Sequence, residues 1–239
     1  MHRIYVSPDE LNDNSGIISD PQTVYYLGSV LRIRVGENIE LFDGLGNLFN
    51  AQVTKATKRE VEFSISASTF FDRPNSPTLI LAQARPKAGK IDDILRMNTE
   101  VGVSAFIVFE AERSQGKPDN HPDKIVRKNK ILQEASRQSE RLYVPELAIA
   151  DDIVKVLNTK ADHKAVLVSR EHEGSVDIAK FKESIQNQDR VIAMVGPEGG
   201  FSQTEIGKAV ATGYVPIHLD LPIMRTETAG VVVSGILMY

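Results

Sequence analysis

Cysteine and tryptophan are absent from this 239-residue chain, and its apolar stretches are short. Without cysteine, disulfide bonds, thiolate nucleophiles and cysteine-ligated zinc sites are excluded. No apolar run approaches the roughly 20 residues that span a bilayer, and the opening MHRIYVSPDE lacks the apolar stretch of a secretion signal. Aromatic residues make up only 6% of the chain, so base stacking is a secondary contribution to any nucleic-acid binding. We therefore expect a cytoplasmic protein without a membrane partner.

Charge is unevenly distributed along the chain. The net charge of −4 argues against indiscriminate nucleic-acid binding, yet residues 113–141 contain eight basic and four acidic residues, a local excess of +4. Such a segment is either a solvated helix face or a surface that contacts phosphates. The five histidines have no metal-ligand spacing, so no metal site is expected.

A change of character near residues 72–77, DRPNSP, predicts a domain boundary, because two prolines and several turn formers meet there. Before it, residues 38–56 and 59–68 alternate between apolar and polar side chains, as hairpin strands with one buried face do. Residues 21–33 have helical spacing behind a proline. We expect a small β-barrel carrying one helix over residues 1–72.

The second part, residues 78–239, alternates apolar runs with helical segments. This rhythm predicts an α/β fold with a mainly parallel sheet, whose ligands bind beyond the carboxyl ends of the strands. The expected strands are TLILAQA, AFIVFEA, KAVLVS, VIAMV and VPIHLDL, and the expected helices lie near residues 90–102, 121–142, 175–187, 202–212 and 226–238.

The turn GPEGGFS, residues 196–202, follows a predicted buried strand and precedes a capping-box pair, Ser202 and Glu205, that opens a helix. It matches neither the dinucleotide fingerprint nor the phosphate-binding loop. A tight turn that merely needs glycine is one interpretation. Glu198 favours another, because a carboxylate at a helix N-terminus competes with phosphate and suits a neutral or cationic ligand such as S-adenosylmethionine.

A second polar cluster, RTETAG at residues 225–230, joins an apolar strand end to a final helix that is small or apolar nearly all round. A simple N-cap by Thr226 with a surface ion pair would account for the cluster. The apolar helix predicts burial in the core or against another subunit.

Together, VGPEGGFSQTE and MRTETA resemble the motifs of the SPOUT-class methyltransferases, and within them of the bacterial 16S ribosomal RNA uracil-N3 methyltransferases. RIYV, VLRIRVGENIELFDG, TEVGVSAFIVFEAERS and EASRQSERLYVPE follow in the order of that family, so the resemblance covers nearly the whole chain.

The resemblance implies an N-terminal PUA-like RNA-binding β-barrel and a C-terminal SPOUT α/β domain with a deep trefoil knot at about residues 165–239. It also implies a homodimer whose active sites lie near the interface. S-adenosylmethionine would lie bent in the knot, and the resemblance assigns to its binding Ser169, Gly196, Glu198, Gly199, Gly200, Leu219, Ile223, Met224, Thr226 and Thr228.

The implied reaction is methylation of N3 of a uridine in 16S rRNA, with the assembled small ribosomal subunit as substrate. Because N3 carries a weakly acidic proton, the enzyme needs a base, for which Glu198 and Glu227 are candidates, and Arg225 could stabilise negative charge on the uracil oxygens. N3 lies on the pairing edge, so the base must be unpaired. We predict that the RNA is contacted by Arg3, Arg32, Arg34, Lys87, Lys90, Arg113, Arg137 and Arg141.

Several positions depart from the family pattern. Asp220 stands where glycine is usual, and a side chain there could narrow the cofactor pocket. Pro222 replaces a polar residue, while Met97, Tyr26 and Arg137 also differ. Two alternatives therefore stay open: an RNA-binding or ribosome-assembly protein that has lost the cofactor, and a methyltransferase acting on a 2′-hydroxyl or on tRNA.

Overall fold

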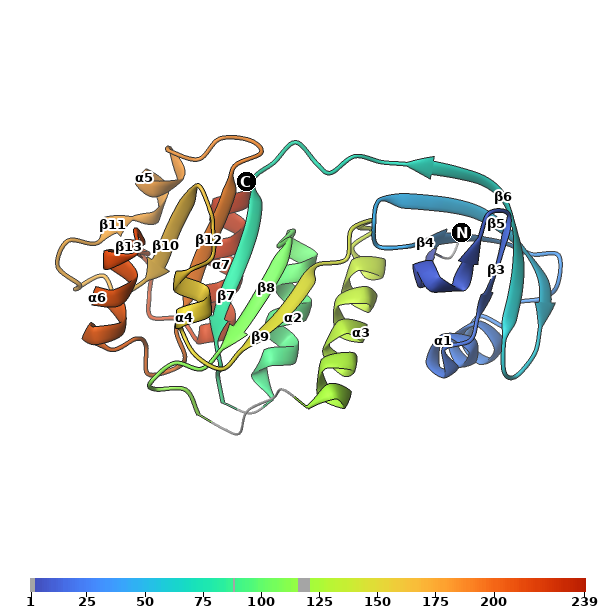
Figure 1. The fold of residues 1–239 in the computed structure, drawn as a ribbon, viewed down its shortest axis with the longest axis horizontal. Coiled ribbons are helices and arrows are strands. Elements are labelled where there is room, and N and C mark those ends of the chain that lie inside the picture. The colour runs from blue at the N-terminus through green and yellow to red at the C-terminus, as the bar shows by residue number, and fades with distance from the viewer. Residues whose placement is uncertain (1–2, 88, 116–120) are drawn as a thin grey trace. The chain divides into compact units, whose positions relative to one another are not determined.

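The computed structural model describes residues 3–87, 89–115 and 121–239, and these form two compact units (Figure 1). Unit 1 comprises the described residues of Met1–Arg73 together with Ser136–Val144. Unit 2 comprises those of Pro74–Ala135 and Pro145–Tyr239. The division between Arg73 and Pro74 falls inside the proline-containing stretch 72–77, whereas no local pattern indicates that residues 136–144 belong to the first unit.

Unit 1 is built on a six-stranded sheet of order β1-β4-β5-β6-β3-β2, parallel between β1 and β4 and antiparallel elsewhere. A short helix that continues into a π-helical turn covers its core. The β-rich unit with one helix is therefore confirmed. Its elements are β1 (Arg3–Tyr5), η1 (Pro8–Glu10), β2 (Leu11–Asn12), β3 (Ser15–Ile18), α1 (Pro21–Tyr25), η2 (Tyr26–Val30), β4 (Asn38–Phe42), β5 (Asn47–Ala56) and β6 (Val61–Phe70).

The segment 136–144 is fastened to the turn between β4 and β5. The Gly46 N–H donates to the Leu142 carbonyl at 3.1 Å, and the Tyr143 hydroxyl donates to the Phe71 carbonyl at 2.8 Å. Gly46 has φ +105°, and a Cβ there would collide with the Tyr143 side chain, so only glycine fits. A distant segment thus becomes part of unit 1 through long-range contacts that have no local sequence signature.

Unit 2 contains a seven-stranded sheet of order β11-β13-β10-β12-β7-β8-β9 in which every pair is parallel. The predicted α/β fold is confirmed, and all carboxyl ends meet at one edge. Its elements are β7 (Thr78–Ala84), α2 (Lys90–Val101), β8 (Ala105–Phe109), α3 (Pro122–Gln138), β9 (Glu146–Ala150), α4 (Val154–Leu157), β10 (His163–Leu167), β11 (Val176–Asp177), α5 (Ile178–Lys182), β12 (Arg190–Val195), α6 (Gln203–Ala211), β13 (Val215–His218) and α7 (Thr226–Met238).

One predicted helix is wrong in extent. Of residues 175–187, only Ile178–Lys182 are α-helical. Val176 and Asp177 instead pair with β13, and the Asp177 carboxylate accepts from the Ala179 N–H at 2.8 Å to start the short helix. Sheet pairing, a long-range interaction, outweighs the local helical pattern here. Strand β11 and helix α4 are too short to be expected from periodicity, and the five-residue strand β9 was also not among the expected strands.

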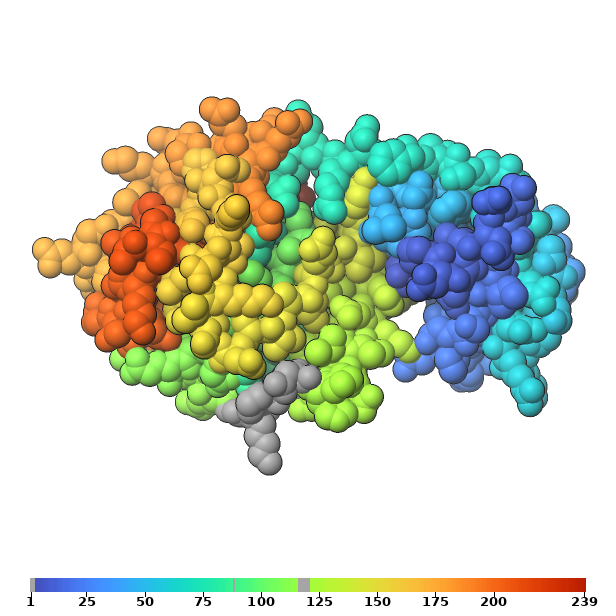
Figure 2. Space-filling model, in the orientation of Figure 1, coloured from blue at the N-terminus to red at the C-terminus, as the bar shows by residue number. Residues whose placement is uncertain are grey.

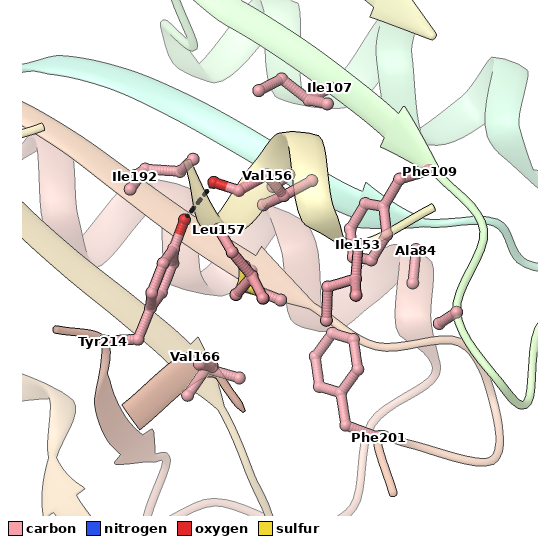
Figure 3. Packing of buried hydrophobic residues seen from close by; sticks show 14 of the residues in the cluster. Ala84, Ile107, Phe109, Ile153, Val156, Leu157, Val166, Ile192, Phe201 and Tyr214 are labelled. Carbon is pink, nitrogen blue, oxygen red and sulfur yellow. Dashed lines mark hydrogen bonds between the residues drawn. The ribbon is translucent and has the colours of Figure 1, made fainter. Parts of the chain in front are cut away.

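The sheet of unit 2 has a core on each face. On one face, α4 and α6 cover an apolar cluster, and their segments form the surface over it (Figures 1 and 2). In this cluster the Phe109 and Phe201 rings stack at 6.3 Å between centroids, and the Tyr214 hydroxyl donates to the Val156 carbonyl at 2.8 Å (Figure 3). Phe201 comes from the glycine turn, so burial of its ring, worth about 1.5–3 kcal/mol, anchors that turn to the sheet.

On the other face, α7 packs against β7 and β12, and α2 packs against α7. The contact includes buried polar groups: the Ser234 hydroxyl donates to Asn98 Oδ1 at 2.8 Å, and the Asn98 amide donates to the Ile94 carbonyl at 2.8 Å. Helix α7 buries one side, as its composition predicted, while Val231, Val232 and Ile236 remain half-buried. The trefoil knot stays a prediction.

None of the helices in the described ranges is both long and apolar enough to cross a membrane.

Candidate active site

The carboxyl ends of β10, β12 and β13 are adjacent in the sheet, and the loops that follow them line a cleft of about 480 Å³. Residues 168–172 follow β10, residues 196–201 follow β12, and residues 219–225 connect β13 to α7. A volume of this size is typical of small-molecule sites. The site thus lies where parallel sheets bind their ligands.

The glycine turn forms the centre of the cleft. Gly200 has φ +65°, and its N–H donates to the Pro197 carbonyl at 2.9 Å. A Cβ on Gly196 would lie 3.2 Å from the Gly200 Cα, a tighter contact than most Cβ atoms make, so a side chain there would push against the backbone of the turn. The turn itself therefore favours glycine at positions 196 and 200, and its glycines leave the backbone bare toward the cleft.

A buried carboxylate holds the turn against its neighbours. Ser202 and Glu205 form the predicted capping box: the Ser202 N–H donates to Glu205 Oε2 at 2.9 Å, and the Glu205 N–H donates to the Ser202 hydroxyl at 3.3 Å. Glu205 Oε1 also accepts from the Glu112 N–H at 2.9 Å. One side chain thus ties the start of α6 to the loop after β8.

The start of α7 is joined to the glycine turn by Thr226. Its hydroxyl donates to the Gly196 carbonyl at 2.6 Å and accepts from Gln83 Nε2 at 3.1 Å. Arg225, not Thr226, occupies the N-cap position, so the predicted Thr226 cap is wrong. The hydroxyl instead forms a long-range bond because Gly196 lies within reach, and this bond connects the two loops of the cleft.

The predicted cofactor residues gather in one place. Nine line the cleft, whereas Thr228 lies exposed on α7 outside the lining. Asp220 is also exposed and outside the lining, so it does not narrow the cleft as the sequence suggested, while Pro222 does contribute. The nine are Ser169, Gly196, Glu198, Gly199, Gly200, Leu219, Ile223, Met224 and Thr226.

The three predicted catalytic residues occupy different positions. Glu198 lines the cleft, whereas Arg225 and Glu227 lie at the start of α7 outside the lining. Lys90 Nζ donates to Glu227 Oε2 at 3.0 Å and lies 3.5 Å from Glu198 Oε1. Burial acts to raise the pKa of Glu227, but its own backbone N–H and Lys90 outweigh burial and lower it. The hydrogen bond to Glu227 raises the pKa of Lys90.

The residues of unit 1 that were predicted to contact RNA differ in exposure and in their contacts with other side chains. Arg32 and Arg34 are exposed. Arg3 is held by the Glu140 carbonyl at 3.0 Å and by Glu40 at 3.4 Å. Arg137 lies over the Tyr26 ring, 5.0 Å from its centroid, so two positions that depart from the family pattern contact each other. Arg141 is half-buried in the segment 136–144.

In unit 2 the predicted RNA residues lie close to the cleft. Arg113 lines the cleft and donates to the Gly199 carbonyl at 2.9 Å. The backbone N–H of Lys87 donates to the Glu198 carboxylate. Lys90 forms ion pairs with Glu198 and Glu227. Not every basic side chain of helix α3 faces solvent as a phosphate contact would, because Lys128 is buried and Arg127 forms an ion pair with Asp92. Lys117, counted in the basic segment, lies outside the described residues.

Sequence reasoning missed several residues that shape the site. Gln83 is buried at the end of β7 and donates to the Gly196 carbonyl at 3.3 Å as well as to Thr226. A single polar residue within the apolar run TLILAQA was the available signal. Arg170, Glu171 and His172 line the cleft directly after Ser169. In the part of the chain that the structure describes, no cluster of three or more His, Cys, Asp or Glu could hold a metal ion.

Glu205→Gln tests whether the buried carboxylate organises the turn. Glutamine offers one acceptor and one donor, so either the Glu112 or the Ser202 N–H loses its partner, at a cost of about 1–3 kcal/mol in the free energy of unfolding. Urea denaturation measures this loss, and amide hydrogen exchange should quicken at Glu112 or Ser202. The matched control is Glu183→Gln, an exposed position expected to change stability by less than about 0.5 kcal/mol. Equal stability of the two variants would contradict the assignment.

Family models match both units of the chain. An RNA methyltransferase domain matches residues 73–238, and an RNA methyltransferase PUA domain matches residues 18–66. Among curated relatives, the ribosomal RNA small subunit methyltransferase E of Rickettsia conorii is 32% identical, covering 96% of this chain and 92% of its own length. The protein of the same name from Synechocystis is 28% identical over 95% of this chain and 74% of its own.

Solved structures agree with these matches. A ribosomal RNA small subunit methyltransferase E from Neisseria gonorrhoeae, bound to S-adenosyl methionine, superimposes with a TM-score of 0.83 at 27% identity, covering 98% of this chain and 95% of that one. A Legionella pneumophila protein in complex with the cofactor SAM gives a TM-score of 0.87 at 27% identity, covering 98% and 96%. With its PUA unit, its parallel α/β unit and matches along nearly its full length, the chain belongs to the RNA methyltransferase family that includes the ribosomal RNA small subunit methyltransferases E.

Proposed function

We propose that this protein transfers a methyl group from S-adenosylmethionine to N3 of a specific uridine in the 16S rRNA of the small ribosomal subunit. The observation that carries the proposal is the cleft at the glycine turn, lined by nine of the residues expected to bind the cofactor. Relatives that cover nearly the whole chain carry the corresponding name, and two structural neighbours hold S-adenosylmethionine.

The cleft fits this cofactor in shape and charge. Glycines at 196, 199 and 200 leave room for close approach to the backbone, and Leu219 and Met224 supply apolar surface for an adenine ring. Glu198 and Glu171 suit a ligand with a cationic sulfur and an ammonium group. The backbone N–H of Glu171 and the Ser169 hydroxyl lower the pKa of Glu171, which keeps this carboxylate ionised.

When bound, S-adenosylmethionine supplies a methyl group that is activated by a positively charged sulfur. The residues of the chain must hold the uracil in line with that methyl group, at about 3–3.5 Å, and must accept the N3 proton as the N–C bond forms. Glu198 and Glu227 are the two candidate carboxylates for accepting this proton. Arg225 would stabilise negative charge on the uracil oxygens.

The PUA unit would hold the RNA. Arg32 and Arg34 are exposed and carry charge suited to phosphates. The target base must be unpaired, which the folded rRNA of an assembled subunit can provide at a fixed position. The half-buried apolar residues Val231, Val232 and Ile236 on α7 favour a homodimer that covers them.

Cofactor binding is tested by isothermal titration with S-adenosylmethionine. We expect saturable binding with Kd on the order of micromolar, weakened at least tenfold (about 1.4 kcal/mol) in Gly199→Val. A Cβ at position 199 would have the Arg113 side chain as its nearest neighbour, at an ordinary contact distance of 3.4 Å, so the fold can accept it while the cleft narrows. Gly207→Val adds the same atoms in open space on α6 and should bind normally. If Gly199→Val bound S-adenosylmethionine as tightly as the wild type, the cofactor site would have to lie away from this turn.

The product identifies the reaction. Purified protein is incubated with S-adenosylmethionine and small subunits that lack the modification, and the rRNA nucleosides are analysed by mass spectrometry. We expect 3-methyluridine in 16S rRNA. A ribose 2′-O-methyl nucleoside, or methylation of tRNA instead, would replace the proposal with the related methyltransferase. Retained RNA binding without cofactor binding would indicate a protein that has lost the activity.

A further inference from the structure

Three charged side chains from three separate elements meet beside the cleft. Lys90 begins α2, Glu198 lies in the turn after β12, and Glu227 lies in the first turn of α7. Lys90 Nζ is 3.0 Å from Glu227 Oε2 and 3.5 Å from Glu198 Oε1. All three side chains are largely shielded, with 30%, 17% and 23% of the side-chain surface exposed for Lys90, Glu227 and Glu198.

We propose that Lys90 is a positioning residue for the methyl transfer: Glu227 anchors its ammonium group, and the ammonium group holds Glu198 as the carboxylate that faces the uracil. This assignment rests on the proposed function and goes beyond it, because it ranks two carboxylates that the sequence left equal. It also gives Lys90 a role other than RNA contact.

The two carboxylates are not equivalent in the structure. Glu198 lines the cleft, whereas Glu227 lies outside its lining and has the shorter contact with Lys90. Both oxygens of Glu198 also lie 3.2 Å from the Lys87 N–H, which donates to them. Glu198 is thus oriented by the Lys87 N–H and the Lys90 ammonium group, whereas Glu227 is hydrogen-bonded to the same ammonium group.

The cation is needed because two carboxylates in one small region repel each other. Lys90 lies between them, so its positive charge offsets part of this repulsion, and the hydrogen bond to Glu227 raises the pKa of Lys90. The positive charge of Arg225 acts on Glu227 from the same turn of α7. A Glu198 side chain held by Lys87 and Lys90 can accept a hydrogen bond from N3–H and then its proton, which leaves the uracil nitrogen free to take the methyl group.

Phosphate contact is the competing role for Lys90, and kinetics separate the two. A lysine that only binds phosphate contributes to RNA affinity, so its removal raises KM for the small subunit and lowers the salt dependence of binding. A lysine that positions a catalytic carboxylate contributes mainly to kcat.

The experiment compares kcat and KM for 3-methyluridine formation on small subunits in four variants and one control. Lys90→Met should lower kcat about 10–100-fold, the range of a misplaced catalytic group, with KM for subunits changed less than about threefold. Lys90→Arg keeps the charge and should recover most of kcat. Glu198→Gln should lose about 100-fold or more in kcat, and Glu227→Gln should lose less. Lys208→Met, an exposed lysine on α6, should match the wild type.

The anchoring pair has its own test in the double variant Lys90→Met/Glu227→Gln. If Glu227 acts through Lys90, the double variant should be no slower than Lys90→Met alone, whereas multiplying losses would contradict the pairing. Melting temperatures confirm that each variant is folded before kinetics are compared.

Three outcomes overturn the inference while the wild type forms 3-methyluridine: an unchanged kcat in Lys90→Met, a rise in KM alone, or a greater loss in Glu227→Gln than in Glu198→Gln. A wild-type protein that forms no 3-methyluridine overturns the proposed function itself, and the inference falls with it. The two failures are therefore distinguished by the wild-type reaction alone.

Discussion

The hydrogen bond from the Thr226 hydroxyl to the Gly196 carbonyl, 2.6 Å long, is the contact on which the site depends. It joins the first residue of α7 to the turn after β12, two segments separated by 30 residues in sequence. Gln83, buried at the end of β7, donates to both partners of this bond and so fixes them to the sheet. In a buried setting each of these polar groups would cost about 1–3 kcal/mol if left without a partner, so the arrangement is strongly specified.

The cleft and the charged cluster follow from that junction. Once the turn and the start of α7 are held together, Glu198 and Glu227 both come within 3.5 Å of the Lys90 ammonium group, whose positive charge offsets the repulsion between them. The same turn is secured on its other side by Phe201 in the apolar core and by Glu205 at the start of α6. The cleft and the candidate catalytic carboxylates are thus positioned by the same set of contacts around the glycine turn.

Sequence reasoning succeeded where the signal was local. The strand Thr78–Ala84 was evident from its continuous apolar run, and the Ser202–Glu205 capping box from its spacing. Reasoning from patterns failed where distant residues decide the structure. Thr226 resembles a helix cap but bonds to Gly196, and residues 136–144 join unit 1 through contacts with the Gly46 turn. Lys90 resembled a phosphate contact, and only the fold brings two carboxylates to it. Family resemblance, rather than periodicity, supplied most of the cofactor residues.

The most direct measurement is the affinity of Thr226→Val for S-adenosylmethionine, by isothermal titration beside the wild type and Thr226→Ser. Valine keeps the shape of threonine but cannot bond to Gly196 or accept from Gln83, so the two loops should lose their register and the affinity should fall at least tenfold, about 1.4 kcal/mol. Serine keeps the hydroxyl and should bind within about threefold of the wild type. An affinity of folded Thr226→Val equal to that of the wild type would contradict the account.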